Sequence, residues 1–155
     1  MKRFLILATA LMMAFSVCAQ SSTNNKAENN GQEQLQPGIY WEKGTLAQAL
    51  EKAKKEGGKM VFLDCYASWC GPCKYMAGTV FTTKEAGDYF NKNFVNIKID
   101  MEKGEGINLA RQFRVQGYPT FIILNSNGKE LGRIVGGAPI NEFIKKVEQV
   151  LKQAK

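Results

Sequence analysis

The amino-acid sequence predicts an α/β domain in which helices flank a central mixed β-sheet. A nearly continuous apolar run at 60–67 is typical of a strand buried on both faces. Alternating apolar residues at 95–99, with helical patterns in between, indicate a second strand that a parallel crossover joins to the first. Two further apolar runs, 120–124 and 131–135, flank Asn125-Ser126-Asn127-Gly128, and an Asn-Gly pair predicts a hairpin turn. The predicted sheet therefore combines a parallel crossover unit with an antiparallel hairpin.

The helices are predicted from side-chain spacing and from the signals at their ends. The segment 45–48 matches a capping box, apolar residues then repeat at helical spacing, and Gly57-Gly58 ends the pattern. A second capping box at 82–85 begins another helix. A helix from about Gly106 to Phe113 and a C-terminal helix that Pro139 opens complete the order.

The 155 residues, 45% hydrophobic and 23% charged, fit one globular domain behind an address segment. The first 19 residues predict a signal peptide, with a short positive start, an apolar run shorter than the roughly 20 residues of a spanning helix, and a small-residue cleavage site after Ala19. The polar stretch 20–37 predicts a flexible linker, and the domain is expected over 38–155, with a short edge strand near 39–41.

Two alternatives to cleavage of a signal peptide after Ala19 remain open. A lipoprotein signal also ends at a cysteine, so the chain could be anchored through a lipid on Cys18, although Val17 fits such a signal poorly. A retained apolar anchor is the other alternative. The predicted location is the periplasm or another exported compartment.

Charge and composition exclude several classes of function. The formal net charge of +7 falls to +5 when Lys2 and Arg3 leave with the signal peptide. No basic run interleaved with aromatic residues is present, so nucleic acid is not an expected partner. The chain has no histidine, which excludes Cys–His and Ser–His dyads and metal sites built on histidine.

The sequence Cys70-Gly71-Pro72-Cys73 lies at a predicted strand-to-helix junction. A helix N-terminus stabilises a thiolate, and two sulfurs one helical turn apart can close a small disulfide. A structural zinc site needs four ligands, whereas the chain beyond residue 19 offers only these two cysteines and Cys65. No metal and no cofactor are therefore expected, and an iron–sulfur centre shared by Cys70 of two chains remains an alternative.

These residues carry a resemblance to a known family. Asp64, Ala67, the run 69–74 and Tyr118-Pro119-Thr120 together resemble the thioredoxin superfamily over roughly 60–151. Trp41 with the helix that follows it, and the phrase 73–76, are similar to exported thioredoxin-like domains, including the C-terminal domain of the membrane electron transporter DsbD. The resemblance implies a thioredoxin fold.

The resemblance also implies a role for each matching residue. Cys70 would be the exposed nucleophile, and the more buried Cys73 would resolve the mixed disulfide with the substrate. Pro119 would be a cis-proline facing the pair, with Tyr118 and Thr120 presenting backbone to the substrate chain. The remaining residues of the expected contact surface are Trp69, Gly71 and Pro72.

Asp64 interrupts an apolar strand six residues before Cys70, so it is expected beneath the site. Burial raises the pKa of a carboxyl group, and such a group could take the proton of Cys73. A purely structural, hydrogen-bonded aspartate is the alternative. The lysine that many thioredoxins carry near this aspartate corresponds to Asn96, so one charge partner is expected to be missing. Cys65 should face away from the pair as a small buried hydrophobe.

The Gly-Pro pair between the cysteines is typical of reducing members of the family. The sequence therefore predicts an exported thiol–disulfide oxidoreductase that reduces disulfide-containing protein substrates and receives electrons from a membrane donor of DsbD type. The alternatives are a disulfide isomerase or oxidase, and a non-catalytic binding module with this fold.

Overall fold

The computed structural model describes residues 37–154. The chain follows the order α1 (Leu46–Lys55), β1 (Met60–Tyr66), α2 (Gly71–Tyr75), the π-helix η1 (Met76–Val80), α3 (Lys84–Asn93), β2 (Phe94–Asp100), α4 (Gly106–Gln112), β3 (Thr120–Leu124), β4 (Glu130–Val135) and α5 (Ile140–Gln153). The predicted signal peptide, with its alternative anchor at Cys18, and the predicted linker up to residue 36 lie outside the described residues. Within 37–154, no helix is both long enough and apolar enough to cross a membrane.

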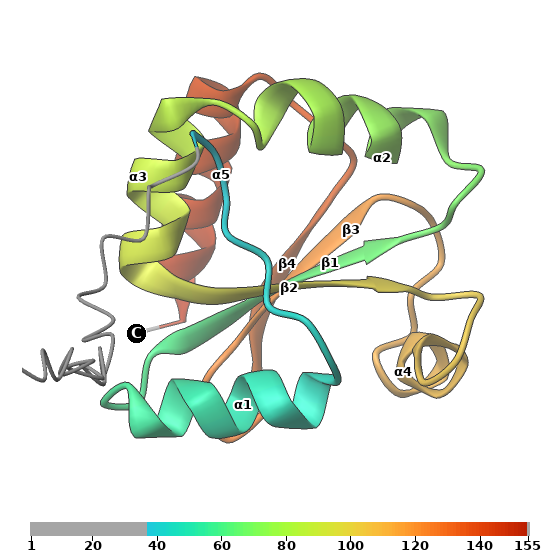
Figure 1. Ribbon diagram of the computed structural model, residues 1–155, viewed down its shortest axis with the longest axis vertical. Helices are drawn as coiled ribbons and strands as arrows, with labels where there is room; N and C mark the ends of the chain where they lie inside the picture. Colours follow the sequence, from blue (N-terminus) through green and yellow to red (C-terminus); the bar gives the residue numbers. More distant parts are fainter. Residues whose placement is uncertain (1–36, 155) are drawn as a thin grey trace, which may run out of the picture. The chain divides into compact units, whose positions relative to one another are not determined.

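The four strands form one mixed sheet in the order β2-β1-β3-β4 (Figure 1). β1 runs parallel to β2, while β3 is antiparallel to both β1 and β4. The turn from β3 to β4 is the predicted one: Gly128 adopts φ 82° and its N–H donates to the carbonyl of Asn125. The predicted mixed sheet with flanking helices is confirmed.

Helices cover both faces of this sheet (Figure 1). The alternation of side chains along β1 separates the two cores. Phe62 belongs to an aromatic core with residues of α3 and α5, whereas Leu63 and Cys65 pack with residues of α1 and α4 on the other face. Asp64 is on the face of Phe62, the face toward which α2 also lies. The sheet thus places one carboxyl group beneath the helix that begins at the Cys-x-x-Cys sequence.

One predicted helix start and one predicted strand are wrong. The helix cap expected at Thr82 is made by Thr83, whose Oγ1 accepts a hydrogen bond from the backbone N–H of Ala86 at 3.2 Å. Thr82 instead donates its hydroxyl to the carbonyls of Gly78 and Thr79, because η1 extends almost to this point. Two adjacent threonines offer the same cap signal, and only the end of the preceding helix selects between them.

The edge strand expected at 39–41 is also not formed. Residues 38–42, here called the N-terminal strap, make one parallel bridge, between Glu42 and Ile97 of β2. Farther up the strap, the N–H of Ile39 donates to the carbonyl of Phe81, in the loop after η1, and the N–H of Tyr40 donates to the side chain of Asn91 in α3. The strap follows the edge of β2 for one pairing and then turns toward the helices.

Candidate redox site

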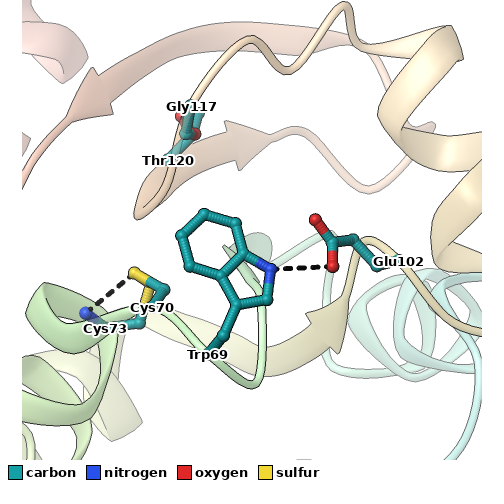
Figure 2. The surroundings of a disulfide bond; sticks show 6 residues. All are labelled: Trp69, Cys70, Cys73, Glu102, Gly117 and Thr120. Atoms are coloured by element: carbon teal, nitrogen blue, oxygen red, sulfur yellow. Dashed lines mark hydrogen bonds between the residues drawn. A yellow bond between two sulfur atoms is a disulfide. The ribbon is translucent and has the colours of Figure 1, made fainter.

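The Cys-x-x-Cys sequence lies where β1 ends and α2 begins, and Cys70 and Cys73 form a disulfide with a Cα–Cα distance of 5.3 Å (Figure 2). Cys70 is the N-cap of α2, and its Sγ accepts a hydrogen bond from the N–H of Cys73 at 3.1 Å. Pro72 occupies the first turn, where its missing N–H is not needed. α2 continues into η1, and the helix start aims a backbone donor at the sulfur of Cys70.

Both cysteines are covered in this disulfide form. Cys70 is 2% exposed and Cys73 is 5% exposed, so the expectation of an exposed Cys70 beside a more buried Cys73 is wrong here. The rings of Tyr66 and Tyr118 pack against the pair. Gly71 and Pro72, between the two cysteines, are exposed as expected of a contact surface.

The segment facing the disulfide contains a cis peptide bond between Tyr118 and Pro119, as the resemblance implies. The carbonyl of Pro119 accepts a hydrogen bond from the N–H of Gly136. Thr120 is buried inside the sheet, and its hydroxyl donates to the carbonyl of Gly117. Among the described residues, Tyr118 alone of these three has no partner for its backbone N–H and C=O. The backbone of Tyr118 is therefore unpaired among the described residues, whereas Thr120 pairs in register with Cys65 of β1 and Val135 of β4.

Trp69 forms the exposed wall of the site, with 66% of its surface accessible. Its indole Nε1 donates to a carboxylate oxygen of Glu102 at 2.8 Å (Figure 2), and its ring meets that of Tyr118 edge to face at 6.0 Å. Sequence reasoning missed Glu102. The available signal was its position just after β2, because parallel strands end at the same edge of a sheet and the Cys-x-x-Cys sequence follows the neighbouring strand.

Asp64 lies beneath the disulfide and is 3% exposed. Its Oδ1 has no hydrogen-bond partner among the described residues. Burial raises the pKa of Asp64 to about 7, and the positive charge of Lys98 opposes part of that rise. A cavity of about 190 Å³ is lined by Asp64, Cys73 and Lys98 together with Tyr66, Ala67, Ser68, Lys74 and Ala77. The carboxyl group and the inner cysteine therefore open onto the same space.

The expectation that Asp64 lacks a cationic partner is wrong. Asn96 is buried and donates its amide to the side chain of Asn91 and to the carbonyl of Tyr40, so it holds the strap. Lys98, two residues farther along β2, pairs in register with Asp64, and side chains at paired positions share one face of the sheet. Sequence alignment by position alone could not identify Lys98, because the partner is defined by register.

Cys65 is a free thiol on the opposite face of β1, as predicted. It is completely buried, and burial, followed by the nearby charge of Asp64, raises the pKa of its thiol. A thiol in that condition is a poor nucleophile. Within the described residues, no group of three or more cysteine and carboxylate side chains comes together as a metal site would require.

The disulfide lies at a strand-to-helix junction, next to a cis-proline and to a cavity that the buried Asp64 also lines. On a mixed sheet with helices on both faces, this arrangement defines the protein as a thiol–disulfide oxidoreductase of the thioredoxin type. Residues 46–151 match the family described as the thioredoxin-like domain, and the chain belongs to this family.

The known proteins that the chain is similar to include thioredoxins and thiol:disulfide interchange proteins. It is 38% identical over 106 residues to the chloroplastic thioredoxin Y of rice, Oryza sativa, covering 68% of this chain and 57% of the relative. It is 29% identical over 148 residues to the thiol:disulfide interchange protein DsbD of Actinobacillus pleuropneumoniae, covering 90% of this chain and 25% of the relative. The chain thus spans about half, or less, of the length of these relatives.

Among solved structures, the fold is similar to that of a putative disulphide-isomerase from Bacteroides thetaiotaomicron. The TM-score is 0.67 with 42% sequence identity, over 74% of this chain and 94% of the other. The Cys70–Cys73 disulfide stands at the active-site position of the family.

Proposed function

We propose that this protein is an exported thiol–disulfide oxidoreductase that reduces protein disulfides through a cycle of Cys70 and Cys73. The observation that carries the proposal is the cavity that Asp64 lines together with Cys73, the inner cysteine of the Cys70–Cys73 disulfide. An exchange reaction needs two sulfurs within bonding distance and an acceptor for the proton of the second thiol, and these groups meet both needs.

The cycle has two exchange steps. The Cys70 thiolate attacks one sulfur of the substrate disulfide, so that a Cys70–substrate bond forms and the other substrate sulfur leaves as a thiolate, which solvent protonates. Cys73 then attacks the sulfur of Cys70, the mixed disulfide breaks, and the second substrate sulfur leaves. Two electrons pass from the protein dithiol to the substrate, and the Cys70–Cys73 disulfide is the product on the protein.

Asp64 is the proposed acceptor for the Cys73 proton. A carboxyl group with a pKa of about 7 is ionised in about half of the molecules at neutral pH and so can both take and return a proton. The chain contains no histidine that could do so in its place.

The proposed contact surface surrounds the disulfide. The unpaired backbone of Tyr118 can bind an extended substrate segment in the manner of an added strand, with Pro119 behind it. Trp69, Gly71 and Pro72 supply exposed surface next to the sulfurs. Thr120 contributes to this surface only indirectly, by its bond to Gly117.

Cysteine variants test the cycle. Cys70→Ser is expected to abolish the reduction of insulin disulfides with dithiothreitol as the electron source, because the attacking sulfur is gone. Cys73→Ser is expected to accumulate a mixed disulfide with the substrate, visible by non-reducing electrophoresis. Cys65→Ser is the matched control and should retain the wild-type rate, since Cys65 is buried on the other face. Insulin reduction by Cys70→Ser at the wild-type rate would contradict the proposal.

The direction of the reaction has its own test. Redox equilibrium with dithiothreitol should place Cys70–Cys73 close to the reduction potential of thioredoxin, about −270 mV, rather than that of the oxidant DsbA, about −120 mV. A protein with such a reducing potential needs a supply of electrons in an oxidising compartment, and a membrane donor of DsbD type is the proposed partner. A potential near the DsbA value would make the protein an oxidase.

Disulfide isomerisation is the second candidate, because the similar structure from Bacteroides thetaiotaomicron carries that description. Scrambled ribonuclease separates the two activities, since an isomerase restores native ribonuclease and a reductase leaves reduced chains. Export is tested by mass spectrometry of the mature protein, which should begin at Gln20 after signal cleavage or at a lipidated Cys18 in a lipoprotein.

A further inference from the structure

The N-terminal strap, residues 38–42, precedes the part of the chain that matches the family, residues 46–151. Its side chain Trp41 nevertheless lies next to Lys98, which lines the redox cavity. Its only tryptophan, Trp41, is half-buried against the aromatic core. The centre of its ring lies 5.6 Å from that of Phe81 and 6.3 Å from that of Phe62. One part of the Trp41 side chain is therefore anchored in the core of the domain.

Backbone hydrogen bonds hold the strap on both sides of Trp41. The N–H of Glu42 donates to the carbonyl of Asn96 at 2.8 Å, and the N–H of Ile39 donates to the carbonyl of Phe81 at 2.8 Å. The buried amide of Asn96 also donates to the carbonyl of Tyr40. Trp41 thus has a defined position beside β2.

Lys98 of β2 lies between two aromatic rings. Its Nζ is 6.0 Å from the ring centre of Trp41 and 6.0 Å from the ring centre of Tyr66. A ring face attracts an ammonium group at such distances, and two rings on one lysine restrict a side chain that solvent would otherwise leave free. Lys98 also lines the cavity onto which Asp64 and Cys73 open.

We propose that Trp41 is a positioning residue of the redox site, which together with Tyr66 holds the ammonium group of Lys98 at the cavity and thereby favours the ionised form of Asp64. The inference deepens the proposed function, in which Asp64 takes the proton of Cys73. The titratable groups that face Asp64 across the cavity are Tyr66 from β1, Cys73 and Lys74 from α2, and Lys98 from β2.

The expected sign follows from electrostatics. A nearby cation stabilises a carboxylate, so a lysine that is free to leave the cavity lets Asp64 hold its proton to higher pH. Trp41 does not line the cavity onto which Asp64 and Cys73 open, so its whole effect passes through Lys98. Loss of Trp41 should therefore matter only while Lys98 is present.

The titration of Asp64 is the direct measurement. The chain contains three aspartates, so carboxyl-labelled [¹³C]aspartate gives three NMR signals, and the Asp64→Asn variant identifies the one from Asp64. The oxidised protein is used, because its Cys70–Cys73 disulfide does not titrate. The wild-type midpoint is expected near pH 7.

Four variants follow from the geometry. Lys98→Met and Trp41→Leu are each expected to raise the midpoint, by roughly half a pH unit or more for Lys98→Met. Trp41→Phe keeps a ring and should stay close to wild type. The double variant Lys98→Met with Trp41→Leu should titrate like Lys98→Met alone, because Trp41 acts through Lys98.

The matched control is Ile39→Ala, which loosens the same strap and the same core without touching Lys98. Its Asp64 midpoint should not move. An equal shift in Ile39→Ala and Trp41→Leu, or a further shift of the double variant beyond Lys98→Met, would overturn the inference. Thermal unfolding of each variant establishes the temperature at which all of them are folded.

A rate measurement separates this inference from the proposed function. Reduced Trp41→Leu should react with glutathione disulfide about two- to threefold more slowly than wild type at pH 7, and at the wild-type rate at pH 9, where Asp64 is ionised in both proteins. If the midpoints shift as expected while Asp64→Asn reacts at the wild-type rate, the positioning of Lys98 stands and the proton transfer by Asp64 in the proposed function fails.

Discussion

At the scale of single residues, the environment of Asp64 distinguishes this site from a simple pair of cysteines. The residue was predictable as a buried carboxyl group, because it interrupts an apolar strand. Its cationic partner was not predictable, because the pairing of Asp64 with Lys98 depends on the register between two strands that are 34 positions apart at this point. The structure therefore adds a positive charge, that of Lys98, to the predicted site, and it retains the predicted buried carboxyl group near Cys73.

The buried carboxyl group makes stability depend on pH. Its pKa is about 7 in the folded protein and near the ordinary aspartate value of 3.8 in the unfolded chain, so the folded state binds more protons between these values and stability falls as pH rises through them. Asp64→Asn removes this dependence. Between pH 4 and pH 8, the free energy of unfolding of the wild type should fall by up to about 4 kcal/mol relative to that of Asp64→Asn.

Urea unfolding of the oxidised proteins at several pH values checks this prediction. Any constant effect of the amide group cancels in the comparison across pH. If the free energy of unfolding depends on pH in the same way in wild type and in Asp64→Asn, folding does not raise the pKa of Asp64, and the prediction is wrong.

The hydrogen bond from Trp69 to Glu102 predicts an effect on substrate binding. Glu102→Ala removes the hydrogen bond that holds the exposed indole of Trp69 beside Tyr118. The KM for a protein disulfide should then rise about threefold, which is the effect of losing roughly one hydrogen bond, while kcat changes little. Glu102→Gln keeps a hydrogen-bond acceptor, so its KM should lie between those of the wild type and Glu102→Ala. Steady-state kinetics with insulin checks this, and Glu142→Ala, an exposed change on α5, serves as the control.

At the scale of elements, most helices and strands follow from local patterns. The capping box of α1 forms as predicted, with Thr45 and Gln48 each satisfying the backbone of the other. The start of α3 differs by one residue, because Thr82 closes η1 and leaves Thr83 to cap. Spacing along the sequence cannot show where a preceding helix ends when no glycine or proline separates the two.

The caps give a paired prediction. Thr83→Ala should lower the free energy of unfolding by about 1 kcal/mol, the usual cost of losing an N-cap side chain. Thr82→Ala removes only bonds from an exposed hydroxyl to carbonyls and should cost less than half as much. Chemical denaturation of both variants tests the order, and an equal cost would contradict the assignment of the cap.

At the scale of the whole molecule, the sheet divides two cores that differ in kind. The core on the side of α3 and α5 is aromatic, and the ring of Phe62 lies within 6.3 Å of six other rings, those of Trp41, Phe81, Phe90, Phe94, Phe121 and Phe143. The same strand that carries Phe62 into this core carries Asp64 beneath the disulfide two residues later. Packing of the aromatic core thus fixes the depth of the carboxyl group.

Phe62→Ala is therefore expected to be among the most damaging single changes in the domain. The lost contacts and the cavity left behind should cost about 3–5 kcal/mol. Phe62→Leu retains most of the volume and should cost less than half of that. Urea unfolding followed by circular dichroism measures both, and a similar cost for the two variants would mean that ring contacts, rather than volume, stabilise this core.

The sequence by itself determined the order of the elements, the mixed sheet and the positions of Cys70, Cys73 and Pro119, because these depend on side-chain periodicity, turn residues and short motifs that act locally. Only the tertiary structure decided that Lys98 rather than Asn96 accompanies Asp64, that Glu102 holds Trp69, and that Trp41 of the strap lies next to Lys98. Each of these contacts joins residues from different elements, and strand register and packing, which no local pattern encodes, bring them together.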